Sequence, residues 1–200
     1  MAKLYFRYGA VSSAKTLNLL AVAHNYERQG KRVVVLKPTF DTRFGTSEVR
    51  SRAGLEREAH RLIADDEVLD PREFEGCSCL LVDEAQFLSA SVVDQLRDLT
   101  RTLDVPVLCY GLRTDFRTHL FEGSRRLLEL ADSIEEIKTT CAFCNRKAIF
   151  NLKLIGGSPS LEGPSKQLGA EELYQPVCYR HYMEKLELDS LAVPELASQV

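Results

Sequence analysis

Eight consecutive residues near the start of the chain have the spacing of a phosphate-binding loop. They are Gly9, Ala10, Val11, Ser12, Ser13, Ala14, Lys15 and Thr16. The pattern is close to G-x-x-x-x-G-K-[ST], in which backbone amides, a helix N-terminus and the lysine surround a polyphosphate, and the final hydroxyl binds Mg²⁺. Ala14 occupies the position of the second glycine. The alternative is an ordinary strand-to-helix turn with Ser12 or Ser13 as the helix N-cap.

Two acidic residues follow an apolar run further along the chain. Residues 79–82 read Cys-Leu-Leu-Val, and Asp83 and Glu84 come directly after them. A carboxylate at the end of a buried strand, downstream of a phosphate loop, is typical of a Mg²⁺ ligand. Glu84 is then well placed to take a proton from an attacking hydroxyl or water. The alternative is that both acids only favour the N-terminus of a following helix.

The C-terminal third contains two short-spaced pairs of metal-binding residues. Cys141 and Cys144 form one pair, and Cys178 and His181 form the other. Two such pairs that meet across a hairpin make a closed tetrahedral site, which is the pattern of structural zinc. The alternative is free thiols beside a surface histidine. Cys77, Cys79 and Cys109 lie in or beside apolar runs and are interpreted as packing residues.

Two further groups are chemically ambiguous. Phe87, Phe116 and Phe121 stand near predicted strand ends, where aromatic rings sandwich a base or fill a core, and the sequence leaves both open. Residues 39–54 form a polar stretch with Asp41 and several arginines, namely Arg43, Arg50 and Arg52. We favour a solvated surface loop for this stretch over an anion clamp.

The elements that must position these residues follow a strand–loop–helix–strand order. Alternating apolar residues from Leu4 to Tyr8 predict a strand, residues 17–29 a helix ending at Gly30, and residues 33–36 a strand buried on both faces. This is a βαβ unit with the phosphate loop at its first turn. Further strands are expected at 79–82, 105–111 and 133–138. Helices are expected at 55–63, from 89 or 91 to 99, and at 124–131.

The remaining chain predicts a smaller second unit. A strand is expected at 148–155, then a long loop rich in Gly, Ser and Pro at 156–170, with Tyr174 shortly before the second metal-binding pair. We predict a nucleotide-binding α/β domain over residues 1–138, a zinc-binding domain over 139–185, and a tail over 186–200.

Composition narrows the class of protein. The 200 residues are 44% hydrophobic and 28% charged, typical of a soluble globular protein. The net charge of −3 argues against an extended nucleic-acid surface. No secretory leader or apolar run of membrane-spanning length is present, so we expect a cytoplasmic protein without membrane or nucleic-acid partners.

Together these residues closely resemble the type II thymidine kinases over about residues 1–185. The resemblance is carried by the strings KLYFRYGAVSSAKT (3–16), KP with DTR (37–43), SRAGL (51–55), VDEAQF (82–87), YGLRTDFR (110–117) and LFEGS (120–124), and by the two metal-binding pairs. That family combines a RecA-like P-loop domain, built on a parallel sheet, with a small zinc-bearing lasso domain.

The resemblance implies transfer of the ATP γ-phosphate to the 5′-hydroxyl of thymidine, with Mg²⁺ and a structural Zn²⁺. It assigns Glu84 as the base, Thr16 and Asp83 to magnesium, and the loop residues with Asp41, Arg43, Asp83 and Gln86 to ATP. It assigns the nucleoside pocket to Val11, Phe87, Leu112, Phe116, Phe121, Leu168, Gly169 and Tyr174. It also implies a homotetramer and feedback inhibition by thymidine triphosphate.

Three positions depart from the family pattern: Ala14 in place of glycine, Val11 in place of methionine, and Leu168-Gly169-Ala170 in place of Ile-Gly-Gly. If the backbone φ is positive at position 14, alanine is strained there. One alternative is therefore a catalytically weakened nucleotide-binding homologue. Another is a zinc-bearing nucleic-acid ATPase, which the acidic composition disfavours.

Overall fold

The computed structural model describes residues 1–41, 47–165 and 173–188. Its centre is a parallel sheet with the strand order β5-β2-β6-β7-β1-β8. The strands are β1 (Leu4–Tyr8), β2 (Val33–Pro38), β5 (Arg61–Ile63), β6 (Cys79–Val82), β7 (Val107–Gly111) and β8 (Ser133–Glu136). Every residue of β2, β6 and β7 is buried, as expected for strands covered on both faces. The predicted α/β class with a parallel sheet is confirmed.

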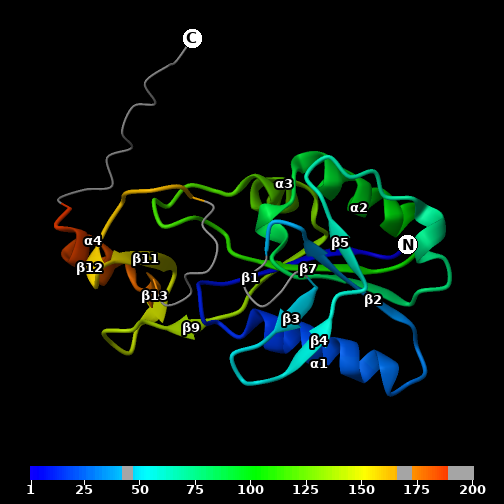
Figure 1. The fold of residues 1–200 in the computed structure, drawn as a ribbon, viewed down its shortest axis with the longest axis horizontal. Coiled ribbons are helices and arrows are strands. Elements are labelled where there is room, and N and C mark those ends of the chain that lie inside the picture. The colour runs from blue at the N-terminus through cyan, green and yellow to red at the C-terminus, as the bar shows by residue number, and fades with distance from the viewer. Residues whose placement is uncertain (42–46, 166–172, 189–200) are drawn as a thin grey trace, which may run out of the picture.

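Helices cover both faces of this sheet (Figure 1). On one face lie α1 (Lys15–Glu27) and a hairpin of β3 (Glu48–Arg50) and β4 (Glu56–Glu58), where Leu19, Leu20 and Ala23 pack on the sheet. On the other face lie α2 (Ala90–Thr102) and α3 (Glu122–Leu130). Two single 3₁₀ turns lie in the connections: η1 (Pro71–Phe74) between β5 and β6, and η2 (Ala85–Phe87) between β6 and α2. The sheet therefore has two separate apolar cores.

The helix predicted at residues 55–63 is wrong. Residues 56–58 pair antiparallel with β3, and residues 61–63 extend the sheet as β5, parallel to β2. Between them, the His60 amide donates to the Val35 carbonyl at 2.8 Å, and the Val35 amide donates to His60 Nδ1 at 2.9 Å. The local apolar spacing suits a helix, but the extended form satisfies the backbone groups of β2 and buries Ile63.

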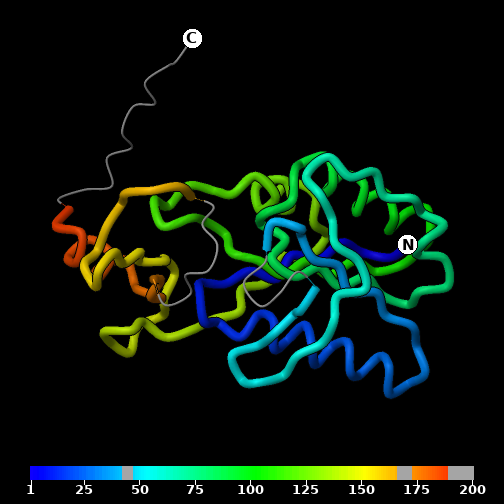
Figure 2. The backbone as a smooth tube through the Cα atoms, in the orientation of Figure 1, coloured from blue at the N-terminus to red at the C-terminus, as the bar shows by residue number. Residues whose placement is uncertain are grey.

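The C-terminal part forms a second, smaller unit beside the sheet (Figure 2). It contains β9 (Thr139–Thr140), β10 (Lys147–Ala148), β11 (Phe150–Ile155), β12 (Ser158–Pro159), β13 (Tyr174–Val177) and α4 (Tyr179–Leu186). Strands β12 and β13 both pair antiparallel with β11. Its buried cluster comprises Cys141, Phe150, Leu152, Val177, Cys178 and Tyr182. We call this unit, residues 139–188, the lasso unit.

The carboxyl ends of the parallel strands bring the candidate residues to one edge. The phosphate loop follows β1, Asp41 follows β2, Asp83 and Glu84 follow β6, and residues 112–116 follow β7. Ligands of open α/β sheets bind at this edge. Among the described residues, no helix combines the length and apolar character needed to cross a membrane.

Candidate active site

The phosphate loop wraps around the ammonium group of Lys15. Lys15 Nζ donates to the Ala10 carbonyl at 2.8 Å, and it lies 3.4 Å from both the Gly9 carbonyl and the Ser13 hydroxyl. Helix α1 begins directly at Lys15, and no side chain caps its first amides. The alternative of a serine N-cap is therefore wrong. The N-terminal amides and the lysine lie together, which is the arrangement that binds a polyphosphate.

The backbone of the loop requires glycine at position 9 and is strained at Ala14. A Cβ at Gly9 would lie 2.3 Å from Ser13 Oγ and 2.5 Å from the Ile137 carbonyl, so only glycine fits there. Ala14, in contrast, has φ 63° and ψ 28°, in the left-handed region. A residue with a Cβ costs about 1–2 kcal/mol in that conformation. The loop is therefore formed with strain at Ala14.

We expect Ala14→Gly to stabilise the protein by about 0.5–1 kcal/mol, because the relieved strain exceeds the entropy that glycine loses on folding. That change corresponds to a rise in Tm of about 1–4 °C for a chain of this size. Ala21→Gly is the matched control, because Ala21 is exposed inside α1. The control is expected to lose about 1 kcal/mol. Equal destabilisation by both changes, measured by thermal unfolding, would contradict strain at Ala14.

Asp83 and Glu84 face the loop from the end of β6. Thr16 Oγ1 lies 3.3 and 3.2 Å from the two carboxylate oxygens of Asp83. Both acids are more than nine-tenths buried. They do not cap the next α-helix, because α2 begins at Ala90 with Ser89 as its cap. The hydroxyl and the carboxylate are thus placed as a pair of oxygen ligands, the kind that Mg²⁺ prefers.

Glu84 is held by the buried amide side chain of Gln86. Gln86 Nε2 donates to Glu84 Oε2 at 2.5 Å, and Gln86 Oε1 accepts from the Leu112 amide at 2.9 Å. Glu84 itself has φ 49°, an unusual backbone conformation for a residue with a side chain. Gln86, expected among the ATP-binding residues, therefore connects Glu84 to the strand end of β7. This arrangement fixes the direction of one carboxylate at the cavity.

Asp41 forms part of a buried ion pair at the end of β2. Its carboxylate lies 3.5 Å from Lys37 Nζ, and both side chains are almost fully buried. Lys37 Nζ also donates to the Glu48 carbonyl at 2.7 Å, which connects β2 to β3. Arg43, expected beside Asp41, lies outside the described residues.

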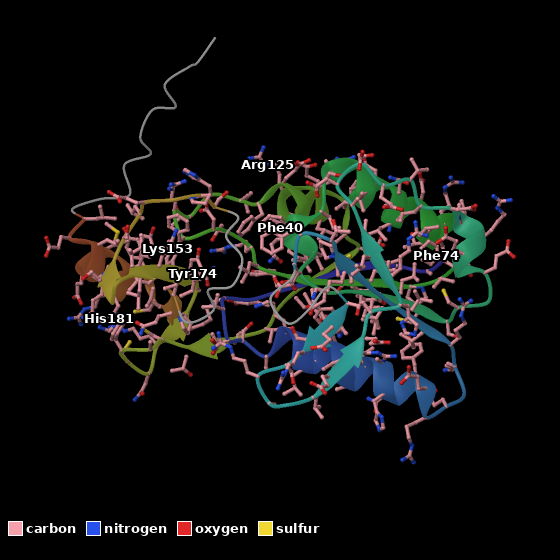
Figure 3. All side chains as sticks on the ribbon, viewed as in Figure 1. Phe40, Phe74, Arg125, Lys153, Tyr174 and His181 are labelled. Atoms are coloured by element: carbon pink, nitrogen blue, oxygen red, sulfur yellow. The ribbon has the colours of Figure 1, made fainter. Side chains whose placement is uncertain are left out.

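A cavity of about 370 Å³ extends from the phosphate loop to the lasso unit. Among the residues that line it are Lys15, Thr16 and Glu84, together with six residues expected to bind a nucleoside: Val11, Phe87, Leu112, Phe116, Phe121 and Tyr174. The rings of Phe87 and Phe121 meet edge to face at 5.7 Å. Figure 3 shows Tyr174 in the lasso unit, together with His181, and Phe40 at the central sheet. The three phenylalanines are buried and line the cavity. Leu168 and Gly169 lie outside the described residues.

Asn151, which no sequence motif singles out, joins three parts of the site. Asn151 Oδ1 accepts from the Val11 amide at 2.9 Å, and Asn151 Nδ2 donates to the Thr114 carbonyl at 3.1 Å. The side chain is 4% exposed and lines the cavity. It therefore couples the phosphate loop, the segment after β7 and the lasso unit. The one signal was an asparagine between Phe150 and Leu152 in an apolar strand.

Further hydrogen bonds fasten the lasso unit to the segment after β7. Tyr182 donates its hydroxyl to the Phe116 carbonyl at 2.5 Å, and Arg117 donates to the Leu161 and Gly163 carbonyls at 2.9 and 2.5 Å. Burial, aided by the nearby charge of Asp115, raises the pKa of Tyr182 to about 12, so the phenol stays a donor. Lys153 Nζ lies 4.6 Å from the centre of the Phe116 ring. The cavity wall is therefore shared by both units.

The four expected zinc ligands converge in the lasso unit. His181 Nδ1 lies 3.4 Å from the sulfurs of both Cys141 and Cys178, and the Cys144 and Cys178 sulfurs lie 3.9 Å apart. Ligand atoms of a tetrahedral zinc site lie about 3.4–3.8 Å apart, given its bond lengths. Burial alone would raise the pKa of the Cys141 thiol, but hydrogen bonds from the backbone amides of Cys178 and Phe143 lower it to about 6. The donor set and spacing fit Zn²⁺.

Comparisons with known proteins identify relatives along most of the chain. A family model described as thymidine kinase matches residues 2–182. The thymidine kinase of Lactiplantibacillus plantarum is 48% identical over 184 residues, which is 91% of this chain and 96% of that protein. Those of Streptococcus gordonii and Enterococcus faecalis are each 47% identical, covering 92% and 91% of this chain and 97% and 95% of those proteins.

Proposed function

The chain belongs to the thymidine kinase family, and from this premise we propose that it transfers the γ-phosphate of ATP to the 5′-hydroxyl of thymidine. The observation that carries the proposal is a single cavity lined by Lys15 of the phosphate loop, by Glu84, and by the aromatic residues Phe87, Phe116 and Tyr174. A phosphate donor and a flat base would then lie at opposite ends, with the carboxylate between them. The comparisons lend no support to a catalytically weakened homologue.

At the phosphate end, the loop amides and Lys15 would bind the ATP phosphates. Thr16 and Asp83 would hold Mg²⁺, which supplies charge neutralisation on the phosphates when bound. Asp41 and Arg43 would act near the phosphoryl group that is transferred. Phosphoryl transfer depends mainly on positioning and electrostatic stabilisation, so this set needs no covalent intermediate on the protein.

Glu84 would accept the proton of the 5′-hydroxyl as that oxygen attacks the γ-phosphorus. The hydrogen bond from Gln86 holds the Glu84 carboxylate at the wall of the cavity, where the hydroxyl would approach it. Because Gln86 is in turn bonded to the Leu112 amide, the base is fixed relative to the nucleoside pocket. A proton acceptor fixed in this way needs no large movement to reach the hydroxyl.

At the other end, the thymine ring would lie among Phe87, Phe116, Phe121 and Tyr174, with Val11 and Leu112 completing the apolar wall. Backbone groups around Leu168 and Gly169 would bind the edge of the base. Aromatic faces and a few polar groups suit a planar pyrimidine, since ring contacts supply area and hydrogen bonds supply orientation.

Other expected properties remain part of the proposal. We retain the division into residues 1–138, 139–185 and a tail, a structural Zn²⁺ on the four converging ligands, and a homotetramer in the cytoplasm. Light scattering on the purified protein tests the assembly.

An assay with ATP, Mg²⁺ and thymidine tests the function. We expect ADP and thymidine monophosphate to form in equal amounts, and ADP formation to fall to background without nucleoside. Zinc content is measured on the same sample, so that protein without zinc is not mistaken for an inactive enzyme. Zinc-loaded, folded protein that makes no thymidine monophosphate would overturn the proposal.

A further inference from the structure

The turn between β3 and β4 presents Arg52 to the phosphate loop. The Gly54 amide donates to the Ser51 carbonyl at 3.1 Å, and Gly54 has φ 83°, which glycine adopts without strain. Ser51 is buried, and it exchanges three hydrogen bonds of 2.8–3.1 Å with the backbone of Leu55. The turn is therefore closed at its base. Arg52 lies at the tip and lines the cavity.

The hairpin has a defined position because it is fastened to the sheet and to α1. Val49 of β3 is 1% exposed and belongs to the apolar core that includes Leu19 and Leu20. Arg57 of β4 forms an ion pair with Glu27 of α1 at 2.8 Å. Figure 1 shows both strands lying along α1. The tip cannot move far from the phosphate loop without disturbing these contacts.

Arg52 touches the loop itself. Its Nη1 donates a hydrogen bond to the hydroxyl of Ser12, in the middle of the phosphate loop. Lys15, Thr16 and Glu84 line the same cavity. A guanidinium group offers several donors in a planar fork that matches the oxygens of a phosphate group. Arg52 is exposed, as expected for a solvated loop, but its side chain also contacts the phosphate loop.

We propose that Arg52 binds phosphate oxygens of ATP, opposite Lys15, and so completes the phosphate site from the β3–β4 turn. This inference rests on the proposed kinase function. In the complex, phosphate oxygens replace the Ser12 hydroxyl as acceptors of the guanidinium protons. The added positive charge also offsets the carboxylates of Asp83 and Glu84, which would otherwise repel the phosphates.

Arg52→Gln tests the proposal, because its effect on ATP can be compared with its effect on thymidine. Loss of a charge-assisted contact to phosphate corresponds to about a 10- to 100-fold fall in kcat/KM for ATP. Arg52→Lys, which keeps the charge without the fork, is expected to lose less. The dissociation constant for thymidine, measured by calorimetry, is expected to stay within about twofold, as for a contact made only to ATP.

Arg72→Gln is the matched control, because Arg72 is exposed and paired with Asp70 away from the cavity. Its kinetics are expected to equal those of the unchanged protein. An Arg52→Gln protein that resembles this control in kcat/KM for ATP would overturn the proposal. Equal losses in thymidine and ATP affinity would also overturn it, since they would indicate a disturbed fold.

Ser12→Ala separates contact with phosphate from support of the loop. If Arg52 acted only through the Ser12 hydroxyl, the Arg52→Gln, Ser12→Ala double variant would lose no more kcat/KM for ATP than Ser12→Ala alone. We expect the double variant to lose more kcat/KM for ATP than Ser12→Ala. Binding of Mg²⁺-ATP, measured without thymidine, tests the Arg52 contact separately from the proposed kinase function. A protein that binds ATP through Arg52 but makes no thymidine monophosphate contradicts the function and not this contact.

Discussion

Replacing Glu84 with glutamine is expected to lower kcat for thymidine phosphorylation by about 10²- to 10⁴-fold, the range typical of a lost general base. Glutamine has nearly the same shape, and its carbonyl oxygen can still accept the hydrogen bond that Gln86 now donates at 2.5 Å. The side chain therefore keeps its place but can no longer take a proton. Steady-state rates with thymidine and ATP measure the effect.

Substrate binding distinguishes a lost base from a damaged site. We expect the dissociation constants of thymidine and ATP to change little in Glu84→Gln, because the cavity wall keeps its shape. Glu129→Gln is the matched control, since Glu129 lies on α3 and pairs with Arg126 at the surface. Its kcat is expected to be unchanged. If the kcat of Glu84→Gln stays within about fivefold of the control, the loss is smaller than a general base usually contributes. That result would show that Glu84 is not the base.

The central sheet was predictable because its strands are buried on both faces. Residues 33–36 and 79–82 are short runs of apolar side chains, and the structure buries each of them completely. Their shortness favours a buried strand over a buried helix segment. The segment 55–63 was not predictable in the same way. Its spacing suits a helix, and only the unpaired edge of β2 decides that it is extended.

The residues of the candidate site also differ in how far the sequence predicts their position. Asp83 directly follows β6, and Lys15 and Thr16 begin α1 after the loop that follows β1, so their convergence at one edge follows from the parallel sheet. Asn151 and Arg52 reach the cavity from a second unit and from a hairpin tip. Their position depends on how those elements dock, and an asparagine or arginine alone does not reveal this. Sequence patterns thus predict the residues that follow the parallel strands better than those carried by elements docked on the sheet.

The lasso unit is too small to be held by its apolar cluster alone. Its six buried members include Cys141 and Cys178, which are themselves candidate zinc ligands. Small cores of this size usually need a metal or disulfides for stability. We therefore expect about one zinc per chain in native protein, as a single four-ligand site implies, and we expect the metal to determine whether this unit folds.

Cys141→Ser is expected to abolish zinc binding and to unfold the lasso unit. Because Asn151, Tyr174 and Tyr182 all depend on that unit, thymidine affinity should fall by more than about 100-fold, the sum of several lost contacts. The sheet has its own two cores, so its cooperative unfolding transition should remain. Elemental analysis gives the zinc content, and hydrogen exchange over residues 139–188 reports the loss of structure.

Cys77→Ser provides the matched control, because Cys77 is a buried thiol of the sheet core rather than a member of the cluster. We expect it to keep zinc and thymidine affinity even if its stability falls. Native protein without zinc would contradict a structural metal site. A Cys141→Ser protein that keeps both its zinc and its protected lasso amides would show that three ligands suffice. If zinc is lost while thymidine still binds normally, the wall formed by the lasso unit does not depend on the metal.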